Sequence, residues 1–118
     1  MNDNTNRGFH GKFADWLGRV PTERGDPFVV AFEHGTLSVE LYAPRGVDAQ
    51  APHGRDEVYV VARGRATFFD GTGRHPVGPG SFLFVAAGQP HRFEDFSPDF
   101  TVWVFFYGPR GGEKETSA

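Results

Sequence analysis

Two residues that could bind a metal ion lie four positions apart in the stretch A-P-H-G-R-D-E (51–57) of this 118-residue chain: His53 and Glu57. On an extended chain, side chains at an even spacing point to the same face. The same spacing would serve on a helix, but Pro52 and the following run V-Y-V-V favour a strand. An imidazole and a carboxylate that converge in an apolar interior are costly unless they are paired or bind a metal. The pair therefore predicts part of a metal site.

His91 is the natural third ligand. It follows Pro90 at the start of a predicted strand, and its even neighbour Phe93 would face the same side. Two histidines and one carboxylate form a facial triad, which leaves positions on the metal open for water, substrate or dioxygen. The alternative is a hydrogen-bonded polar cluster in a barrel without a metal.

Four further side chains are candidates for a catalytic role. Arg55 lies an even step from both residues of the pair, so it could clamp a substrate carboxylate with two hydrogen bonds, or lie at the rim as a loop residue. Tyr59 and Tyr107 could line the pocket and orient a substrate or an oxygen species, or belong to the core with their hydroxyls at the rim. His34 is a turn residue that could tilt toward the cavity as a proton donor.

The composition excludes several other kinds of site. The chain has no cysteine, which rules out disulfides, zinc–thiolate sites, iron–sulfur clusters and cysteine nucleophiles. The net charge is −3 and the arginines are scattered, so no basic surface for nucleic acid is expected. No apolar run approaches the about 20 residues that span a bilayer, and the N-terminus lacks a signal-peptide core. We therefore expect a cytoplasmic protein that binds neither nucleic acid nor a membrane.

The elements that must position these residues are short strands. The chain holds 16 Gly and 9 Pro, which punctuate strands joined by turns, and 13 Phe that supply much of the core. Turn residues separate apolar runs at 27–33, 36–42, 56–63, 65–70, 81–85, 91–96 and 99–107. A single open sheet this apolar would leave a face and two edges unburied, so about eight strands predict an all-β sandwich or barrel.

The phenylalanines of the later strands are predicted to form the core and to leave a pocket wall that is apolar and poorly charged. They are Phe82, Phe84, Phe93, Phe100, Phe105 and Phe106.

The two ends of the chain are predicted to differ from this barrel. Within 1–20, apolar residues at helical spacing followed by Gly18 and Pro21 indicate one short helix that packs on the barrel or forms a dimer contact. These apolar residues are Phe9, Phe13, Trp16 and Leu17. The barrel itself is expected to occupy 21–108, and the polar segment 109–118 is predicted to be a disordered tail.

The two histidine-bearing segments resemble the two motifs of the cupin superfamily. The first is P-H-G-R-D-E (52–57) followed after six residues by Gly64, and the second is G-x5-A-A-G-x2-H-x3-D (80–95). Fifteen residues separate the two motifs, as in small one-barrel cupins. The resemblance implies a single double-stranded β-helix barrel, the jelly-roll form of the cupins, and a metal bound by His53, Glu57 and His91.

The chain departs from the cupin pattern in both motifs. Ala51 stands where a cupin carries the first histidine of its His-x-His pair, and Gly46 lies one residue nearer than the pattern has it. Ala86 and Asp95 replace a proline and an asparagine. The resemblance thus transfers three ligands and not four. Gln50 is the nearest group that could fill the fourth place through its amide oxygen, or it is a solvated loop residue.

The resemblance implies two classes of function. The first is an oxygenase or isomerase-type enzyme, in which Mn, Fe, Ni, Co or Zn acts on a small organic acid or enol as Lewis acid, or activates dioxygen if it is iron. The second is a module that binds a small molecule or metal, or a structural domain that has lost its chemistry, which Ala51 favours. A homodimer is also expected, both from the resemblance and from the apolar run V-W-V-F-F-Y (102–107).

Overall fold

The computed structural model describes residues 8–48 and 50–114, which form one short helix and eight strands. The elements are α1 (Phe13–Leu17), β1 (Phe28–His34), β2 (Leu37–Tyr42), β3 (Asp56–Arg63), β4 (Ala66–Phe69), β5 (Arg74–Val77), β6 (Phe82–Val85), β7 (Arg92–Glu94) and β8 (Thr101–Tyr107). The predicted all-β fold with a short N-terminal helix is confirmed. No helix in these two ranges is long and apolar enough to cross a membrane.

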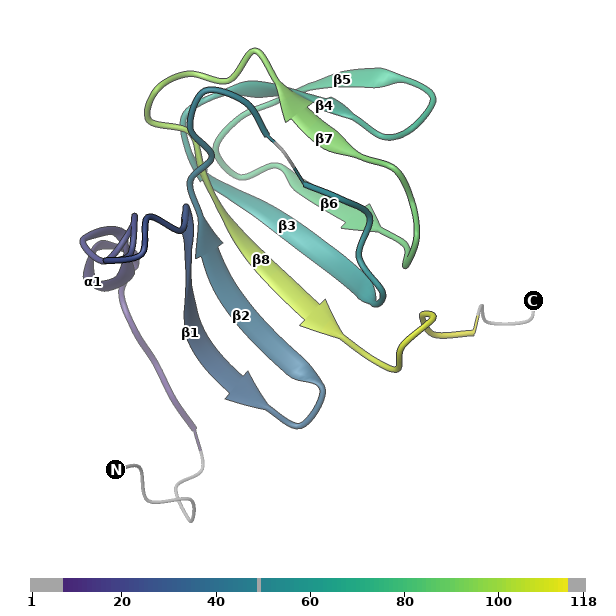
Figure 1. Ribbon diagram of the computed structural model, residues 1–118, viewed down its shortest axis with the longest axis horizontal. Coiled ribbons are helices and arrows are strands. Elements are labelled where there is room, and N and C mark those ends of the chain that lie inside the picture. Colours follow the sequence, from purple (N-terminus) through teal and green to yellow (C-terminus); the bar gives the residue numbers. More distant parts are fainter. Residues whose placement is uncertain (1–7, 49, 115–118) are drawn as a thin grey trace.

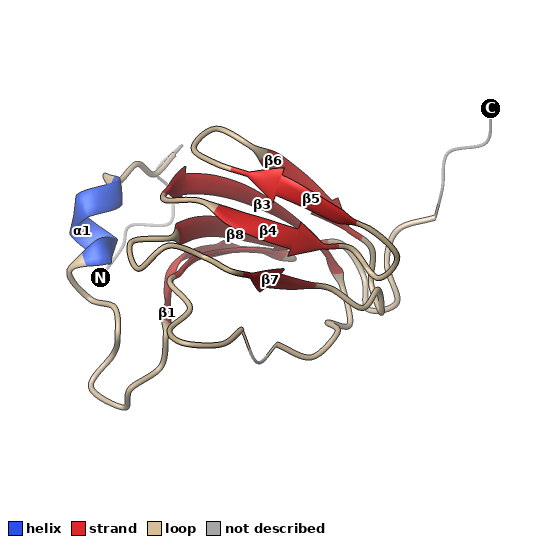
Figure 2. Ribbon diagram, turned by 90° about the horizontal axis from the view of Figure 1, so that it is seen from above, coloured by secondary structure: helices blue, strands red, loops and turns tan. Residues whose placement is uncertain are grey.

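The strands form two antiparallel sheets. The larger has the order β1-β2-β8-β3-β6 and the smaller the order β5-β4-β7. Strands far apart in the chain lie side by side in both, so that β8 pairs with β2 and β3, and β4 pairs with β7 (Figure 1). Figure 2 shows the smaller sheet stacked on the larger one. Pro76 lies in β5, an edge strand, where its missing N–H breaks no ladder.

The core lies between the two sheets. Alternation along each strand directs Tyr59 and Val61 of β3 inward, where they pack with Phe68 of β4 and Phe93 of β7. Val102 and Val104 of β8 belong to the same cluster. This interior is where the predicted ligand Glu57, two positions before Tyr59, also points.

The outer face of the larger sheet is apolar too, and α1 covers one part of it. The Trp16 ring lies 6.4 Å from that of Trp103 on β8, and Phe9 stacks at 4.8 Å on Phe32 of β1. Phe9 precedes the helix, which begins only at Phe13. The helical spacing of the apolar residues therefore predicted their packing better than it predicted the helix start.

Two of the predicted core phenylalanines lie on this outer face instead. Phe82 is 74% exposed and Phe84 is 53% exposed. In β6 the inward positions belong to Leu83 and Val85, so alternation sends both phenylalanines outward on an edge strand. Phe105 of β8 shares their face, because it pairs with Val58, which pairs with Phe84. The core prediction was therefore wrong for these side chains.

The segment after β8 is ordered as far as it is described, in contrast to the predicted disorder from residue 109. Gly111 donates its backbone N–H to the carbonyl of Gly54 at 2.7 Å, and Glu113 donates its own to Asp56 Oδ2 at 2.8 Å. The buried Asp56 carboxylate needs donors, and the chain after β8 supplies one of them. The end of the predicted tail, 115–118, lies outside the described residues.

Candidate metal centre

The two segments that carry the histidines are joined by backbone contacts. The loop between β6 and β7 donates twice to the start of β3: Gly88 N–H to the His53 carbonyl at 2.7 Å, and Ala87 N–H to Asp56 Oδ1 at 2.9 Å. These bonds continue the pairing of β3 with β6 beyond the ends of both strands. They fix His53 and His91, which are 38 positions apart in the chain, on opposite sides of one small space.

His53, Glu57 and His91 converge as the sequence predicts. Their ligand atoms all lie within 4.8 Å of one another. Glu57 Oε1 lies 3.7 Å from His53 Nε2 and 3.2 Å from His91 Nε2. The side chains of Glu57 and His91 have no exposed area, whereas that of His53 is 33% exposed. The cluster therefore meets solvent through His53.

The His91 ring is oriented for a role as ligand. Its Nδ1 lies 2.8 Å from the Gln89 carbonyl, which can only accept, so Nδ1 carries the proton and Nε2 faces the cluster. Burial opposes a charge on the ring, but the Glu57 carboxylate and the Gln89 carbonyl favour one, and the pKa of His91 is raised above its ordinary value. The imidazole is thus presented to the site with one defined nitrogen.

The Glu57 carboxylate provides a test of whether these residues fit a cation. Neither of its oxygens is exposed, and neither accepts a hydrogen bond from any described residue. A buried carboxylate without a donor is unstable unless a positive charge compensates it. Ligand atoms at about 2.0–2.2 Å from a metal lie about 3 Å apart, close to the 3.2 and 3.7 Å between Glu57 Oε1 and the Nε2 atoms of His91 and His53. The residues present therefore fit a divalent metal ion.

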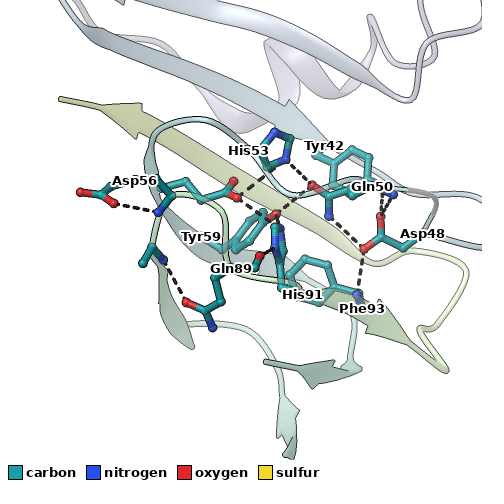
Figure 3. Close-up of polar contacts among 12 residues, drawn as sticks. Tyr42, Asp48, Gln50, His53, Asp56, Tyr59, Gln89, His91 and Phe93 are labelled. Atoms are coloured by element: carbon teal, nitrogen blue, oxygen red, sulfur yellow. Dashed lines mark hydrogen bonds and ion pairs between the residues drawn. The ribbon is translucent and has the colours of Figure 1, made fainter. Parts of the chain in front are cut away.

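Gln50 and Tyr59 extend the same ring of polar atoms (Figure 3). Gln50 Oε1 lies 3.1 Å from His53 Nε2 and accepts a hydrogen bond from the Tyr59 hydroxyl at 2.9 Å. The Tyr59 oxygen is also 3.0 Å from His91 Nε2. Burial and the Glu57 charge raise the pKa of Tyr59, so its phenol keeps its proton.

A cavity of about 840 Å³ opens beside this cluster. His53 and Gln50 form part of its wall, and the buried Glu57 and His91 lie behind them. Aromatic and aliphatic side chains of β1, β2 and β8 form another part: Phe28, Val30, Tyr42, Val104 and Phe106. The cavity wall is partly apolar, but of the six phenylalanines predicted to form it only Phe106 does, and the prediction of little charge was wrong. The charged lining residues are Glu33, Glu40, Arg45, Arg55 and Arg110.

Glu40 is a lining residue that sequence reasoning missed. It lies on the inner face of β2, between Val30 of β1 and Val104 of β8. Burial, followed by repulsion from Glu57 and Glu33, raises its pKa to about 7, although Arg55 opposes the shift. Along β2 the side chains alternate between two faces, and Glu40 lies on the face with two other polar residues, whereas three aliphatic residues lie on the opposite face. This alternation could have indicated Glu40 from the sequence. That aliphatic face is the outer one.

Of the four side chains predicted as candidates for a catalytic role, two lie beside the site and two lie away from it. Arg55 lines the cavity, where its guanidinium donates to the Thr36 carbonyl and lies 6.0 Å from the Phe106 ring centre. His34 is exposed at the end of β1 and stacks on Phe32, away from the cavity. Tyr107 follows Phe106 on β8 and so faces the other side of the sheet. Arg55 and Tyr59 thus lie beside the three candidate ligands, and His34 and Tyr107 do not.

Comparisons with known proteins agree with this arrangement. A family model described as the cupin domain matches residues 38–107. An uncharacterised protein of Streptomyces coelicolor, SCO3923, is 43% identical over 75 residues, which are 62% of this chain and 71% of that protein.

Two solved structures illustrate the likeness in fold. A cupin-2 domain protein from Shewanella frigidimarina has a TM-score of 0.67 at 15% identity, over 82% of this chain and 93% of its own. The DMSP lyase DddQ from Ruegeria pomeroyi has a TM-score of 0.57 at 25% identity, over 79% of this chain and 53% of its own. Because the family match covers more than half of the chain and includes both histidine-bearing segments, the chain belongs to the cupin family.

Proposed function

We propose that this protein is a metal-dependent enzyme of the isomerase or lyase type that transfers a proton on a small organic acid. The observation that carries the proposal is the Glu57 carboxylate, which is buried without a hydrogen-bond donor among the described residues, beside two histidines and an open cavity. The likeness to a DMSP lyase at 25% identity supports an enzyme in a fold of this kind.

The metal would be bound by His53, Glu57 and His91. Nitrogen and carboxylate ligands suit Mn, Fe, Ni, Co or Zn. When bound, the ion supplies Lewis acidity, which stabilises negative charge that develops on a substrate oxygen. The part of His53 that is exposed lies on the cavity side, so a substrate in the cavity would reach the site there.

The charges of the cavity favour an anionic substrate. Arg45, Arg55 and Arg110 all line it, and none of them forms an ion pair within the part of the chain that the structure describes. A guanidinium binds a carboxylate through two parallel hydrogen bonds. Arg55 is the best placed, because its contacts with Thr36 and Phe106 hold its side chain against the wall next to His53.

Glu40 is the group best suited to move the proton. A general base works best when its pKa lies near the operating pH, and the pKa of Glu40 is about 7. It lines the same cavity as His53 and Arg55, so a carboxylate substrate bound between them would present a neighbouring carbon to it. Tyr59 keeps its proton and would donate a hydrogen bond to an oxygen at the site.

A second candidate is an oxygenase. Two histidines and one carboxylate are the ligand set of non-haem iron oxygenases, and these three residues converge here. Oxygen consumption by the iron-loaded protein over a panel of small enols and organic acids would favour this reaction over proton transfer.

The proposal is tested by metal content and by proton exchange. The wild-type protein, supplemented with Mn, Fe, Ni, Co or Zn, is expected to hold about one ion per chain, and His53→Ala and His91→Ala are expected to lose it. His34→Ala, which removes an exposed histidine on the other face, is the matched control. Metal-dependent exchange of carbon-bound hydrogen for deuterium in a small carboxylate would support the reaction. A wild-type protein without metal after supplementation would overturn the proposal.

We also propose that the chain forms a homodimer through the outer face of the larger sheet. Phe82 and Phe84 are exposed there, next to Val58 and Val60 of β3. Exposed apolar patches of this kind are typical of protein interfaces.

A further inference from the structure

We propose that Gln50 is the fourth metal ligand and that Asp48 is a positioning residue that holds the Gln50 carboxamide with its oxygen toward the metal. This inference rests on the metal site of the proposed function and specifies its composition. Ala51, at the place of the usual cupin histidine, would then be compensated by an oxygen ligand from the preceding residue.

Asp48 is a buried carboxylate held from two sheets. Its Oδ1 accepts a hydrogen bond from the hydroxyl of Tyr42, on β2, at 2.5 Å, and its Oδ2 accepts one from the backbone N–H of Phe93, on β7, at 2.8 Å. Asp48 itself is only 5% exposed. Because its donors come from different sheets, the carboxylate cannot turn without loss of one of these bonds.

This fixed carboxylate determines which end of the Gln50 amide faces the site. A carboxylate can only accept hydrogen bonds, and Gln50 Nε2 donates to Asp48 Oδ2 at 2.9 Å (Figure 3). The backbone N–H of Gln50 also donates to Asp48, to Oδ1 at 3.4 Å. The amide oxygen must therefore point to the opposite side. The reverse orientation would set the amide oxygen against the carboxylate, where neither group can donate a hydrogen bond.

On that opposite side the amide oxygen joins the metal ligands. Gln50 Oε1 lies 3.1 Å from His53 Nε2, within the range expected for two atoms bound to one ion. Without a metal, His53 Nε2–H can donate a hydrogen bond to this oxygen. Once His53 Nε2 binds an ion it has no proton to give, so the ion replaces the proton as the partner of Oε1. The Tyr59 hydroxyl, which donates to Oε1 at 2.9 Å, holds the oxygen in place in both states.

The alternative is that Asp48 only ties the segment between β2 and β7 together. The two roles differ in what Asp48→Asn does to metal binding. An asparagine has a single acceptor oxygen, and its amide nitrogen would favour the reversed Gln50 amide, with nitrogen facing the site. A structural role would lower the unfolding temperature and leave metal affinity unchanged.

The experiment uses Co²⁺ as the probe, because its visible absorption reports the number and type of ligands. Gln50→Ala and Asp48→Asn are each expected to raise the Kd for Co²⁺ by about 10- to 100-fold and to shift the spectrum. Gln50→Glu keeps an oxygen toward the site and is expected to bind Co²⁺ more tightly than Gln50→Ala, but its second oxygen would face the Asp48 carboxylate, so the wild-type spectrum is not expected to return in full. Asp48→Asn is expected to add little to the effect of Gln50→Ala, because both act on one ligand. Asp70→Asn, at an exposed turn, is the control.

Unchanged Co²⁺ affinity and spectrum in Gln50→Ala would overturn the inference while the proposed function stands. An additive effect of Asp48→Asn on top of Gln50→Ala would overturn the positioning role. If Asp48→Asn fails to fold, Gln50→Ala and Gln50→Glu still decide whether Gln50 is a ligand. A wild-type protein that binds no Co²⁺ would overturn both proposals, and this outcome differs from the loss of the Gln50 effect alone.

Discussion

At the scale of single residues, the site differs from the rest of the barrel in two acidic groups that repel each other. Glu57 is fully enclosed, and Glu40 lines the cavity with a pKa raised to about 7. Glu57 is buried without a donor among the described residues, and the ionised form of Glu40 is disfavoured by burial and by the nearby Glu57 charge. Stability should therefore respond to changes that remove a charge or add a cation.

Glu40→Gln is expected to make the protein more stable above neutral pH. The pKa of Glu40 is raised from 4.5 in the unfolded chain to about 7, so its protonated form is favoured in the fold. The free energy of unfolding of the wild-type protein therefore decreases as pH rises from about 4.5 through 7. The glutamine variant does not titrate at this position, so its free energy of unfolding lacks this decrease. The expected gain at pH 8 is about 1–2 kcal/mol after solvent screening.

Urea unfolding of both proteins between pH 4 and 8 measures this difference. Glu23→Gln, at an exposed position before β1, corrects for the loss of one negative charge. Parallel stability curves for wild type and Glu40→Gln across this range would contradict the raised pKa.

For Glu57, the expected effect of a compensating charge on stability can be tested by adding a metal ion. An ion that binds only the folded chain stabilises it by about 2.7 kcal/mol when its free concentration is 100 times its Kd. For a domain of this size we expect an increase in Tm of the order of 10 °C. Glu57→Gln is expected to abolish this increase, as measured by differential scanning calorimetry with and without metal. An equal increase in the variant would show that the ion binds elsewhere.

At the scale of elements, the site depends on loops that are bound to the start of β3. Asp56 at the start of β3 accepts from Ala87 in the loop before β7 and from Glu113 after β8. One carboxylate therefore organises three segments close to Glu57. Neither donor is near Asp56 in sequence, so no local pattern could predict these bonds.

Asp56→Ala is expected to destabilise the fold by about 1–3 kcal/mol, because two backbone donors lose their acceptor. It is also expected to weaken metal binding, because the loop that it releases leads to His91. Chemical unfolding and a metal titration measure the two effects, and Asp99→Ala, in an exposed loop, is the control. An unchanged metal affinity would show that this loop contact does not hold the metal site in place.

Local patterns in the sequence predicted most of the strands and the convergence of His53, Glu57 and His91, whereas features that depend on distant contacts were missed. Alternation and turn glycines predicted every strand except β5, and even spacing with the two motifs predicted which three side chains converge. The pattern could not tell which face of β2 points inward, because both faces of the larger sheet are apolar over most of their area. Glu40 was therefore missed. The role of Asp48 was missed for another reason, since its partner Phe93 lies 45 positions away.

At the scale of the whole molecule, the proposed dimer would form through the exposed phenylalanines of β6. They lie on the opposite face of the larger sheet from the cavity, so a dimer formed there would leave the cavity accessible. The wild-type protein is expected to elute as a dimer, and Phe82→Ser with Phe84→Ser as a monomer with unchanged metal affinity. Multi-angle light scattering gives the mass, and His34→Ala, on the same outer face, is the control. A monomeric wild type at all concentrations would contradict this interface.

The order of the segment after β8 has a practical consequence for handling this protein. Arg110 contributes to the cavity, and Gly111 and Glu113 bond to the residues on either side of Arg55. A purification tag or fluorescent fusion attached shortly after residue 113 would disturb these contacts and with them the wall of the cavity. Tags are better attached ahead of α1, which lies on the outer side of the larger sheet. Binding data collected with a tag at the other end should be repeated after its removal.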